Sequence, residues 1–212
     1  MLIALITCAV LTYRVMSSPG HNITGFILAG GASKRMGREK AALFYDGRSF
    51  VAHITEALRA VAAQVNIVGA RAPKDAGHLP FIPDCYANWG ALGGLHAALA
   101  SCPTNWAAVV ACDLPLVSGA LLEHLASLRA KFDAVAPIQA NGYPQPLCAL
   151  YRVAPSLACA QQLIASGERR PRVLLRAVRT RWVTPGEIAS LPNAARLLTN
   201  VNTPDEYGAL TL

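Results

Sequence analysis

A pair of glycines followed by a cluster of basic side chains is the stretch of this sequence best suited to chemistry. Gly30 and Gly31 can adopt backbone angles closed to other residues, and their N–H groups can approach a phosphate without a Cβ in the way. The basic residues that follow closely are Lys34, Arg35, Arg38 and Lys40. This combination predicts a loop that binds a polyphosphate.

The loop matches neither of two well-known phosphate-binding patterns. Gly31 and Gly37 are one residue too far apart for the P-loop, and Arg38 stands where that motif requires lysine. The dinucleotide fingerprint is excluded because no third glycine has the required offset. From its glycines alone, the stretch remains open to interpretation as a plain glycine-rich turn.

Asp113 is the carboxylate best placed to hold a metal ion. It follows the apolar run 106–112, which predicts a central buried strand whose C-terminal end faces the same crevice as the glycine loop. Mg²⁺ prefers one or two carboxylates together with phosphate oxygens and water, so one aspartate beside a triphosphate suffices. The structural alternative for Asp113 is the N-cap of a helix. A second aspartate, Asp84, ends the short strand expected at 79–84, and its structural alternative is a surface turn.

Alternating strand and helix patterns predict the elements that position these residues. The run 23–28 is typical of a buried strand that delivers the glycines to the crevice, and Ser49 is expected to cap the helix after it. Further strands are predicted at 65–68, 106–112, 134–137 and 143–151, helices at 118–131 and 155–166, and a strand, a turn and a helix start at 198–204. The sequence therefore predicts an α/β fold with a mostly parallel central sheet and helices on both faces.

The composition favours a well-buried domain with an anionic ligand. Hydrophobic residues make up 53% and charged residues 15%, which excludes disorder, and the net charge is +7. Part of this excess lies in an arginine-rich segment, for which a solvated helical face is the alternative to phosphate recognition: Arg169, Arg170, Arg172, Arg176, Arg179 and Arg181. Because this segment lacks interleaved aromatics and a recognisable reading element, we expect no nucleic-acid partner.

The cysteines and the N-terminus indicate a cytoplasmic protein. The six cysteines and five histidines show neither a Cys-x-x-Cys pair nor metal-ligand spacing, which is typical of reduced thiols. The apolar run in residues 1–15 is shorter than the roughly 20 residues that span a bilayer, so we expect no membrane partner. We expect 1–22 to be an N-terminal extension, with Met16 as the true start, and 23–212 to form a single domain.

The glycine loop resembles the opening loop of the molybdenum cofactor guanylyltransferases. The shared motifs there are Leu28-Ala29-Gly30-Gly31, Arg35-Met36-Gly37 and Glu39-Lys40, followed by Asp113-Leu114-Pro115 and Asn200-Val201-Asn202-Thr203-Pro204 in the same order. This chain departs from the family pattern at several places: Glu39 replaces an aspartate, Ala91 replaces a proline, Gln145-Pro146 stands where many relatives have His-Pro, and the asparagine often found near Gly69 is absent.

The resemblance implies a three-layer Rossmann-like nucleotidyltransferase fold that transfers GMP from GTP to the terminal phosphate of molybdopterin or the molybdenum cofactor. It implies nucleotide contacts from Leu28, Ala29, Gly30, Gly31, Lys40, Gly69, Asp84 and Asp113. Catalysis would rest on Arg35, Lys40 and Asp113, with Mg²⁺ on Asp113. The acceptor would contact Gln145, Arg169, Arg170, Asn200 and Asn202, and molybdoenzyme apoproteins or their chaperones are the expected protein partners.

Two alternatives remain at this stage. A cytidylyltransferase of the same fold, with a molybdopterin or isoprenoid acceptor, would use the same chemistry, although those enzymes usually have Leu-Ala-Ala-Gly where this chain has Gly30-Gly31. A non-catalytic nucleotide-binding regulator or an adaptor is the alternative from another class. The presence of Gly30, Lys40 and Asp113 together argues against it.

Overall fold

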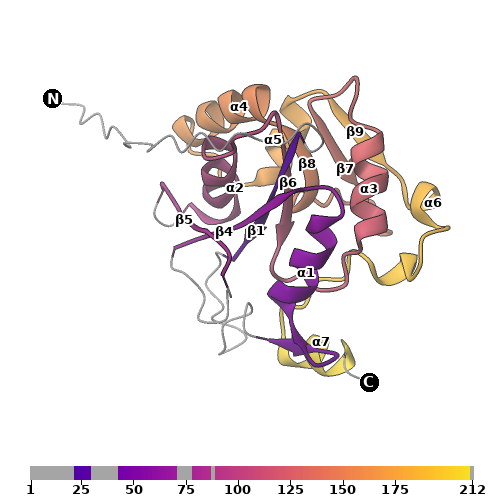
Figure 1. The fold of residues 1–212 in the computed structure, drawn as a ribbon. Coiled ribbons are helices and arrows are strands. Elements are labelled where there is room, and N and C mark those ends of the chain that lie inside the picture. Colours follow the sequence, from indigo (N-terminus) through magenta and orange to yellow (C-terminus); the bar gives the residue numbers. More distant parts are fainter. Residues whose placement is uncertain (1–21, 30–42, 71–77, 87–88, 211–212) are drawn as a thin grey trace, which may run out of the picture.

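The computed structural model describes residues 22–29, 43–70, 78–86 and 89–210. Their core is a seven-stranded sheet with the strand order β5-β4-β1-β6-β8-β7-β9 (Figure 1). Its strands are β1 (Ile23–Leu28), β4 (Gln64–Gly69), β5 (Phe81–Pro83), β6 (Trp106–Ala111), β7 (Ala134–Pro137), β8 (Cys148–Arg152) and β9 (Thr180–Val183). A separate hairpin pairs β2 (Phe44–Tyr45) with β3 (Arg48–Ser49).

Six strands of the sheet run in one direction, and β8 runs against them. β1 pairs in parallel with both β4 and β6, β4 with β5, and β7 with β9, whereas β8 is antiparallel to β6 and β7. The predicted mostly parallel sheet is therefore confirmed. The ends of β1, β4 and β6, at Leu28, Gly69 and Ala111, lie at one edge of the sheet, which we call the carboxyl edge.

Helices cover both faces of the sheet. The helices are α1 (Phe50–Arg59), α2 (Gly90–Ala100), α3 (Gly119–Ser127), α4 (Val153–Ala165), α5 (Pro171–Ala177), α6 (Pro185–Ile188) and α7 (Pro204–Leu210), with a 3₁₀ turn, η2, at Ala194–Arg196. In Figure 1, α1 and α3 lie on one face, and α2, α4 and α5 lie on the other. This arrangement is the three-layer α/β architecture expected from the sequence.

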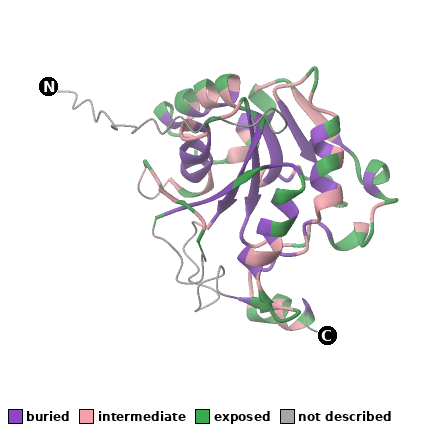
Figure 2. Ribbon diagram, viewed as in Figure 1, coloured by how far each residue is buried: buried purple, intermediate pink, exposed green. Residues whose placement is uncertain are grey.

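Side-chain alternation along the central strands builds the two cores between these layers. Ile27 and Val110 face the α1 and α3 side, whereas Phe26 and Val109 face the α2, α4 and α5 side. All four are fully buried, and the central strands form the purple interior of Figure 2. Each such side chain contributes about 1.5–3 kcal/mol relative to an exposed position, so the central strands are held rigidly beneath the carboxyl edge.

Local signals explain where several elements begin. The Ser49 hydroxyl accepts from the N–H of Ala52 at 3.2 Å, which confirms the predicted cap of α1. Pro204 starts α7 as expected, because its missing N–H and fixed φ suit a first helical turn. The strand expected at 143–151 begins only at Cys148. Pro144 and Pro146 cannot donate to a ladder, so the preceding stretch makes only an isolated bridge.

The C-terminal segment differs from its prediction. Residues 198–200 form no strand, and the segment is tied down by single contacts, such as the bond from the Val201 N–H to the Asp113 carbonyl at 2.9 Å. Helix α7 packs beside the β2–β3 hairpin, where the Tyr207 hydroxyl donates to the Phe44 carbonyl at 2.7 Å (Figure 1). The segment therefore returns to the carboxyl edge at the end of β6.

Candidate active site

The end of β1 is held between its two neighbours at the carboxyl edge. The Ala29 N–H donates to the Val68 carbonyl at 2.8 Å, and the Leu28 carbonyl accepts from the Cys112 N–H at 3.0 Å. The described chain stops at Ala29, between the ends of β4 and β6. The predicted loop residues Gly30, Gly31, Arg35 and Lys40 lie outside the described residues.

Asp113 and the end of β1 flank the point where the strand order reverses. From β1 the chain adds β4 and β5 on one side and then returns to add β6 on the other. In open α/β sheets, ligands bind at such a switch point, outside the carboxyl ends of the strands. Asp113 follows β6 by two positions and Ala29 follows β1 by one, so both lie at this place.

A magnesium ion fits the chemistry of the Asp113 carboxylate. Mg²⁺ prefers oxygen ligands and keeps waters, so one carboxylate with substrate phosphate oxygens meets its needs. Among the residues that the structure describes, no three His, Cys, Asp or Glu side chains gather into a possible metal cluster. An ion bound by Asp113 would therefore take its remaining ligands from elsewhere, as it does when shared with a triphosphate.

Asp84 lies at the neighbouring strand end with a buried oxygen. Its backbone N–H donates to the Gly69 carbonyl at 3.0 Å, so these two predicted site residues lie side by side. Within the described part of the chain, Asp84 Oδ1 is buried without a hydrogen-bond partner, and burial raises the pKa of this carboxyl. A Cβ added to Gly94 would lie 3.4 Å from Oδ1 and 3.8 Å from the Leu28 side chain. Because Gly94 has no side chain, helix α2 leaves space beside this oxygen of Asp84.

Gln145 and Asn200, predicted as acceptor contacts, are brought together. Gln145 is buried, and its Nε2 donates to Asn200 Oδ1 at 3.2 Å. Its Oε1 accepts from the Leu147 N–H at 3.4 Å. Nearby in the chain, the Asn202 N–H donates to Glu206 Oε2 at 2.5 Å. The structure therefore places the Gln145 amide just before β8 and the Asn200 amide on the approach to α7.

The two predicted acceptor arginines, Arg169 and Arg170, have different environments. Glu168 binds Arg170 through two parallel bonds, from Nε at 2.8 Å and from Nη2 at 2.7 Å. The side-chain and backbone hydrogen bonds from Arg170 lower the pKa of Glu168 to about 2. The Arg169 guanidinium instead lies over the indole ring of Trp89, 5.1 Å from its centroid.

Trp89, Glu168 and Gly94 are not among the site residues that the sequence predicts. Their relevance depends on contacts between segments distant in the sequence, such as Trp89 with Arg169. No local pattern signals such contacts.

One small cavity lies beside Gln145 and Arg170, two of the residues predicted to contact the acceptor. It has a volume of about 430 Å³ and is lined by Tyr143, Pro144, Pro146, Arg170, Pro171 and Arg172. Tyr143 is among the most exposed large apolar side chains, at 59%. This cavity adjoins Gln145 in the chain, on the β8 side of the carboxyl edge.

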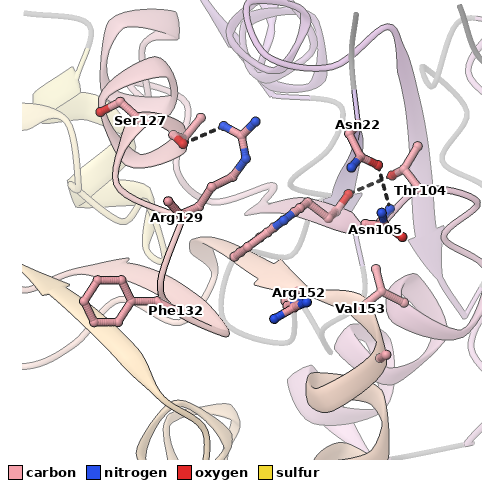
Figure 3. Close-up of a pocket in the computed structure, with 12 residues that line it drawn as sticks. Asn22, Thr104, Asn105, Ser127, Arg129, Phe132, Arg152 and Val153 are labelled. Carbon is pink, nitrogen blue, oxygen red and sulfur yellow. Dashed lines mark hydrogen bonds between the residues drawn. The ribbon is translucent and has the colours of Figure 1, made fainter. Parts of the chain in front are cut away.

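A larger cavity of about 670 Å³ lies at the opposite edge of the sheet, at the start of β6 and the end of β8 (Figure 3). The Arg129 guanidinium in it donates to the Ala126 carbonyl at 2.6 Å, and Arg152 pairs with Asp133 at 3.7 Å. Figure 3 shows the two guanidinium groups directed apart. Since its charges do not converge on a common point, this cavity is not the candidate site.

Among the helices that the structure describes, none has the length and apolar character of a membrane span.

Comparison with known proteins places the chain in a family. Residues 25–182 match the model of the MobA-like NTP transferase domain. A probable molybdenum cofactor guanylyltransferase of Flavobacterium johnsoniae is 30% identical, over 91% of this chain and 98% of that protein. The molybdenum cofactor guanylyltransferase of Pseudomonas putida is 33% identical, over 84% and 92% respectively.

Solved structures agree with this placement. Molybdopterin-guanine dinucleotide biosynthesis protein A of Archaeoglobus fulgidus is 27% identical, with a TM-score of 0.74 over 88% of this chain and 96% of that one. A 2-C-methyl-D-erythritol 4-phosphate cytidylyltransferase of Thermus thermophilus, 15% identical over 87% and 95%, has a TM-score of 0.63 and shares the fold. The chain thus belongs to the MobA-like NTP transferase family, and it is a nucleotidyltransferase.

Proposed function

We propose that this protein transfers GMP from GTP to the terminal phosphate of molybdopterin, with or without bound molybdenum, and releases pyrophosphate. The names of the relatives support this reaction. The observation that carries it concerns Asp84 Oδ1, which is buried beside Leu28 and Gly94 without a hydrogen-bond partner among the described residues, close to the switch point. The Watson–Crick edge of guanine presents two adjacent N–H donors to such a carboxylate, whereas cytosine presents one amino group.

The nucleotide is held along the carboxyl edge in this proposal. The base lies against Asp84, Gly69 and the backbone of Leu28 and Ala29, and the triphosphate extends toward Asp113. The N–H groups of the glycine pair and the Lys40 ammonium bind the phosphates, and Arg35 neutralises charge that develops at the α-phosphate. The resulting order from base to phosphates follows the order of strand ends from β5 to β6.

Catalysis then consists mainly of alignment. The acceptor phosphate is already an ionised nucleophile, so no covalent enzyme intermediate and no strong general base are required. When bound, Mg²⁺ supplies charge neutralisation and orients the phosphate oxygens. The carboxylate of Asp113 fixes the position of that charge, and the rigid strand β6 beneath it keeps the geometry suited to in-line attack.

The acceptor lies on the β8 side of the edge. Gln145 and Asn200 act as a hydrogen-bonded pair, and Asn202 contributes from the approach to α7. Arg169 and Arg170 supply positive charge for the pterin phosphate. We also propose that 23–212 acts as one catalytic domain in the cytoplasm and that molybdoenzyme apoproteins or their chaperones receive the product.

Equilibrium binding of GTP and CTP tests the role of Asp84. The wild type should bind GTP more tightly than CTP, and Asp84→Asn should lower GTP affinity about tenfold or more, because one hydrogen bond to a charged group contributes about 1.5–3 kcal/mol. Asp205→Asn, on the exposed start of α7, is the matched control. Tighter binding of CTP than GTP would instead favour the cytidylyltransferase alternative, which shares this fold.

A further inference from the structure

We propose that Trp89 is a positioning residue, whose indole ring holds the guanidinium of Arg169 at the carboxyl edge for the acceptor phosphate. This inference rests on the proposed function, because it assigns the acceptor as the group that Arg169 meets. The contact joins the connection between α4 and α5 to the beginning of α2. The guanidinium lies 5.1 Å from the ring centroid, within the range of a cation–π interaction.

The position of Trp89 connects Arg169 to the nucleotide end of the molecule. Trp89 is the N-cap of α2, and five positions later Gly94 lies against Asp84 and Leu28. A side chain stacked on Trp89 is therefore tied to the same helix that borders the proposed base site. The side chain of Arg169 is exposed, and stacking on a fixed ring reduces the number of rotamers that such a side chain samples.

The ring itself is held on several sides. The backbone N–H of Trp89 donates to the Tyr86 carbonyl at 3.4 Å, which fixes the main chain that carries the ring, and the Trp89 and Tyr86 rings meet edge to face with centroids 6.1 Å apart. Tyr86 in turn packs edge to face on His96 at 5.0 Å. Gly93 leaves the space for this arrangement, because a Cβ there would lie only 2.9 Å from the Trp89 Cβ. Trp89 is thus a fixed platform rather than a surface ring free to turn.

The neighbouring arginine provides the contrast. Arg170 is paired through two bonds with Glu168, which also accepts from the N–H groups of Arg169 and Arg170 at 2.8 and 2.9 Å. Glu168 therefore fixes the backbone and one arginine, whereas the Arg169 side chain stacks on Trp89. The structure assigns the two arginines different supports, and only that of Arg169 reaches α2.

Steady-state kinetics of GMP transfer separate positioning from simple structural support. The variants are Trp89→Leu, Trp89→Phe, Arg169→Gln and the double variant Trp89→Leu/Arg169→Gln, with Arg176→Gln on the exposed side of α5 as control. Trp89→Leu should raise the KM for molybdopterin about five- to tenfold while the KM for GTP stays unchanged, because preorganisation of one charged contact is lost. Trp89→Phe should keep the KM for molybdopterin close to the wild-type value. The double variant should have a KM for molybdopterin no higher than that of Arg169→Gln alone.

Other kinetic results would overturn the inference. Equal rises in both KM values, or additive effects in the double variant, would show that Trp89 does not act through Arg169. An active wild type whose Trp89→Leu variant behaves identically would do the same. Absence of GMP transfer by the wild type itself would instead overturn the proposed function, so the two failures are distinguishable.

Fluorescence tests the contact without turnover. Arg169→Gln should change the tryptophan emission of the protein, Arg176→Gln should not, and the difference should disappear in the Trp89→Phe background. If Trp89→Leu loses its folded circular dichroism signal, the emission of Arg169→Gln and Arg169→Lys still tests the contact, because both variants keep the Trp89 ring. Emission that is unchanged by both substitutions at Arg169 would contradict the contact.

Discussion

The Nε2 group of Gln145 donates a hydrogen bond to Oδ1 of Asn200 over 3.2 Å, joining the loop before β8 to the approach of α7. This bond uses Oδ1 of Asn200 as the acceptor, so it does not involve the Nδ2 donors of that amide. Gln145 is 7% exposed and Asn200 is half-buried, so the Gln145 end of the bond is shielded from water. The pair links two predicted acceptor contacts into one unit.

Gln145→Leu tests this unit. The change keeps the volume but leaves Asn200 Oδ1 without its donor, so we expect the KM for molybdopterin to rise about fivefold and the KM for GTP to stay constant. Gln139→Leu is a matched control, because the Gln139 amide also contacts the C-terminal segment, at the Leu198 carbonyl over 3.4 Å, without touching Asn200. An equal effect of both substitutions on the acceptor KM would argue against a specific role of the pair.

The half-buried Asp84 carboxyl predicts a pH dependence of stability. Because burial raises its pKa above the usual 3.8, the folded protein holds this proton more tightly than the unfolded chain. The contribution of this proton to stability is therefore complete below pH 3.8 and is lost as pH rises through the raised pKa. Without nucleotide, Asp84→Asn should be more stable than the wild type at neutral pH, and the difference should shrink on acidification. Thermal unfolding at a series of pH values measures it, and a destabilised Asp84→Asn at neutral pH would contradict this reading.

Two adjacent glycines of α2 predict opposite effects. Gly94→Ala should stabilise the fold by up to about 1 kcal/mol through helix propensity, yet weaken GTP binding, since its methyl group would lie 3.4 Å from Asp84 Oδ1. Gly93→Ala should destabilise the fold, because its Cβ would lie 2.9 Å from that of Trp89. Chemical denaturation and GTP titration of both variants check the pair. Unchanged GTP affinity in Gly94→Ala would show that this space is not used by the base.

Glu168 should matter for the acceptor but not for GTP. Glu168→Gln removes the charge that supports the Arg170 pair, so the loop before α5 should loosen and the acceptor KM should rise severalfold, about as for loss of one charge-assisted bond. Glu187→Gln is the control, because Glu187 makes a similar set of bonds to Thr184 and Arg181 around α6. Equal kinetics of the two variants would remove Glu168 from the acceptor site.

The central fold could be predicted because its signals are local. The apolar runs of β1 and β6 and the Ser49 cap all lie within a few residues of the structure they specify. The antiparallel pairing of β8 with β6 could not be assigned in this way, since the two strands are far apart in the sequence and are brought together by tertiary packing. The strand β9 has no such signal, because it begins at the end of the arginine-rich segment, which suggested a solvated helical face.

The site follows the same division. The position of Asp113 at the end of an apolar strand can be predicted from the sequence, and the structure places this residue at the switch point. Three relationships bring together segments that are far apart in the sequence: the burial of Asp84 Oδ1 near Leu28 and Gly94, the stacking of Arg169 on Trp89, and the bond between Gln145 and Asn200. Such relationships arise only when the sheet has assembled.

The most direct test of the proposed reaction is pyrophosphate release with Mg²⁺ and molybdopterin, compared for GTP and CTP in the wild type and Asp113→Asn. The substitution keeps the backbone carbonyl that accepts from Val201, so the edge should remain folded. The account predicts GTP-dependent release that falls at least about a hundredfold in Asp113→Asn, because the loss of metal-assisted charge stabilisation costs several kcal/mol. Release that depends on CTP instead of GTP, or that survives the substitution, would contradict it.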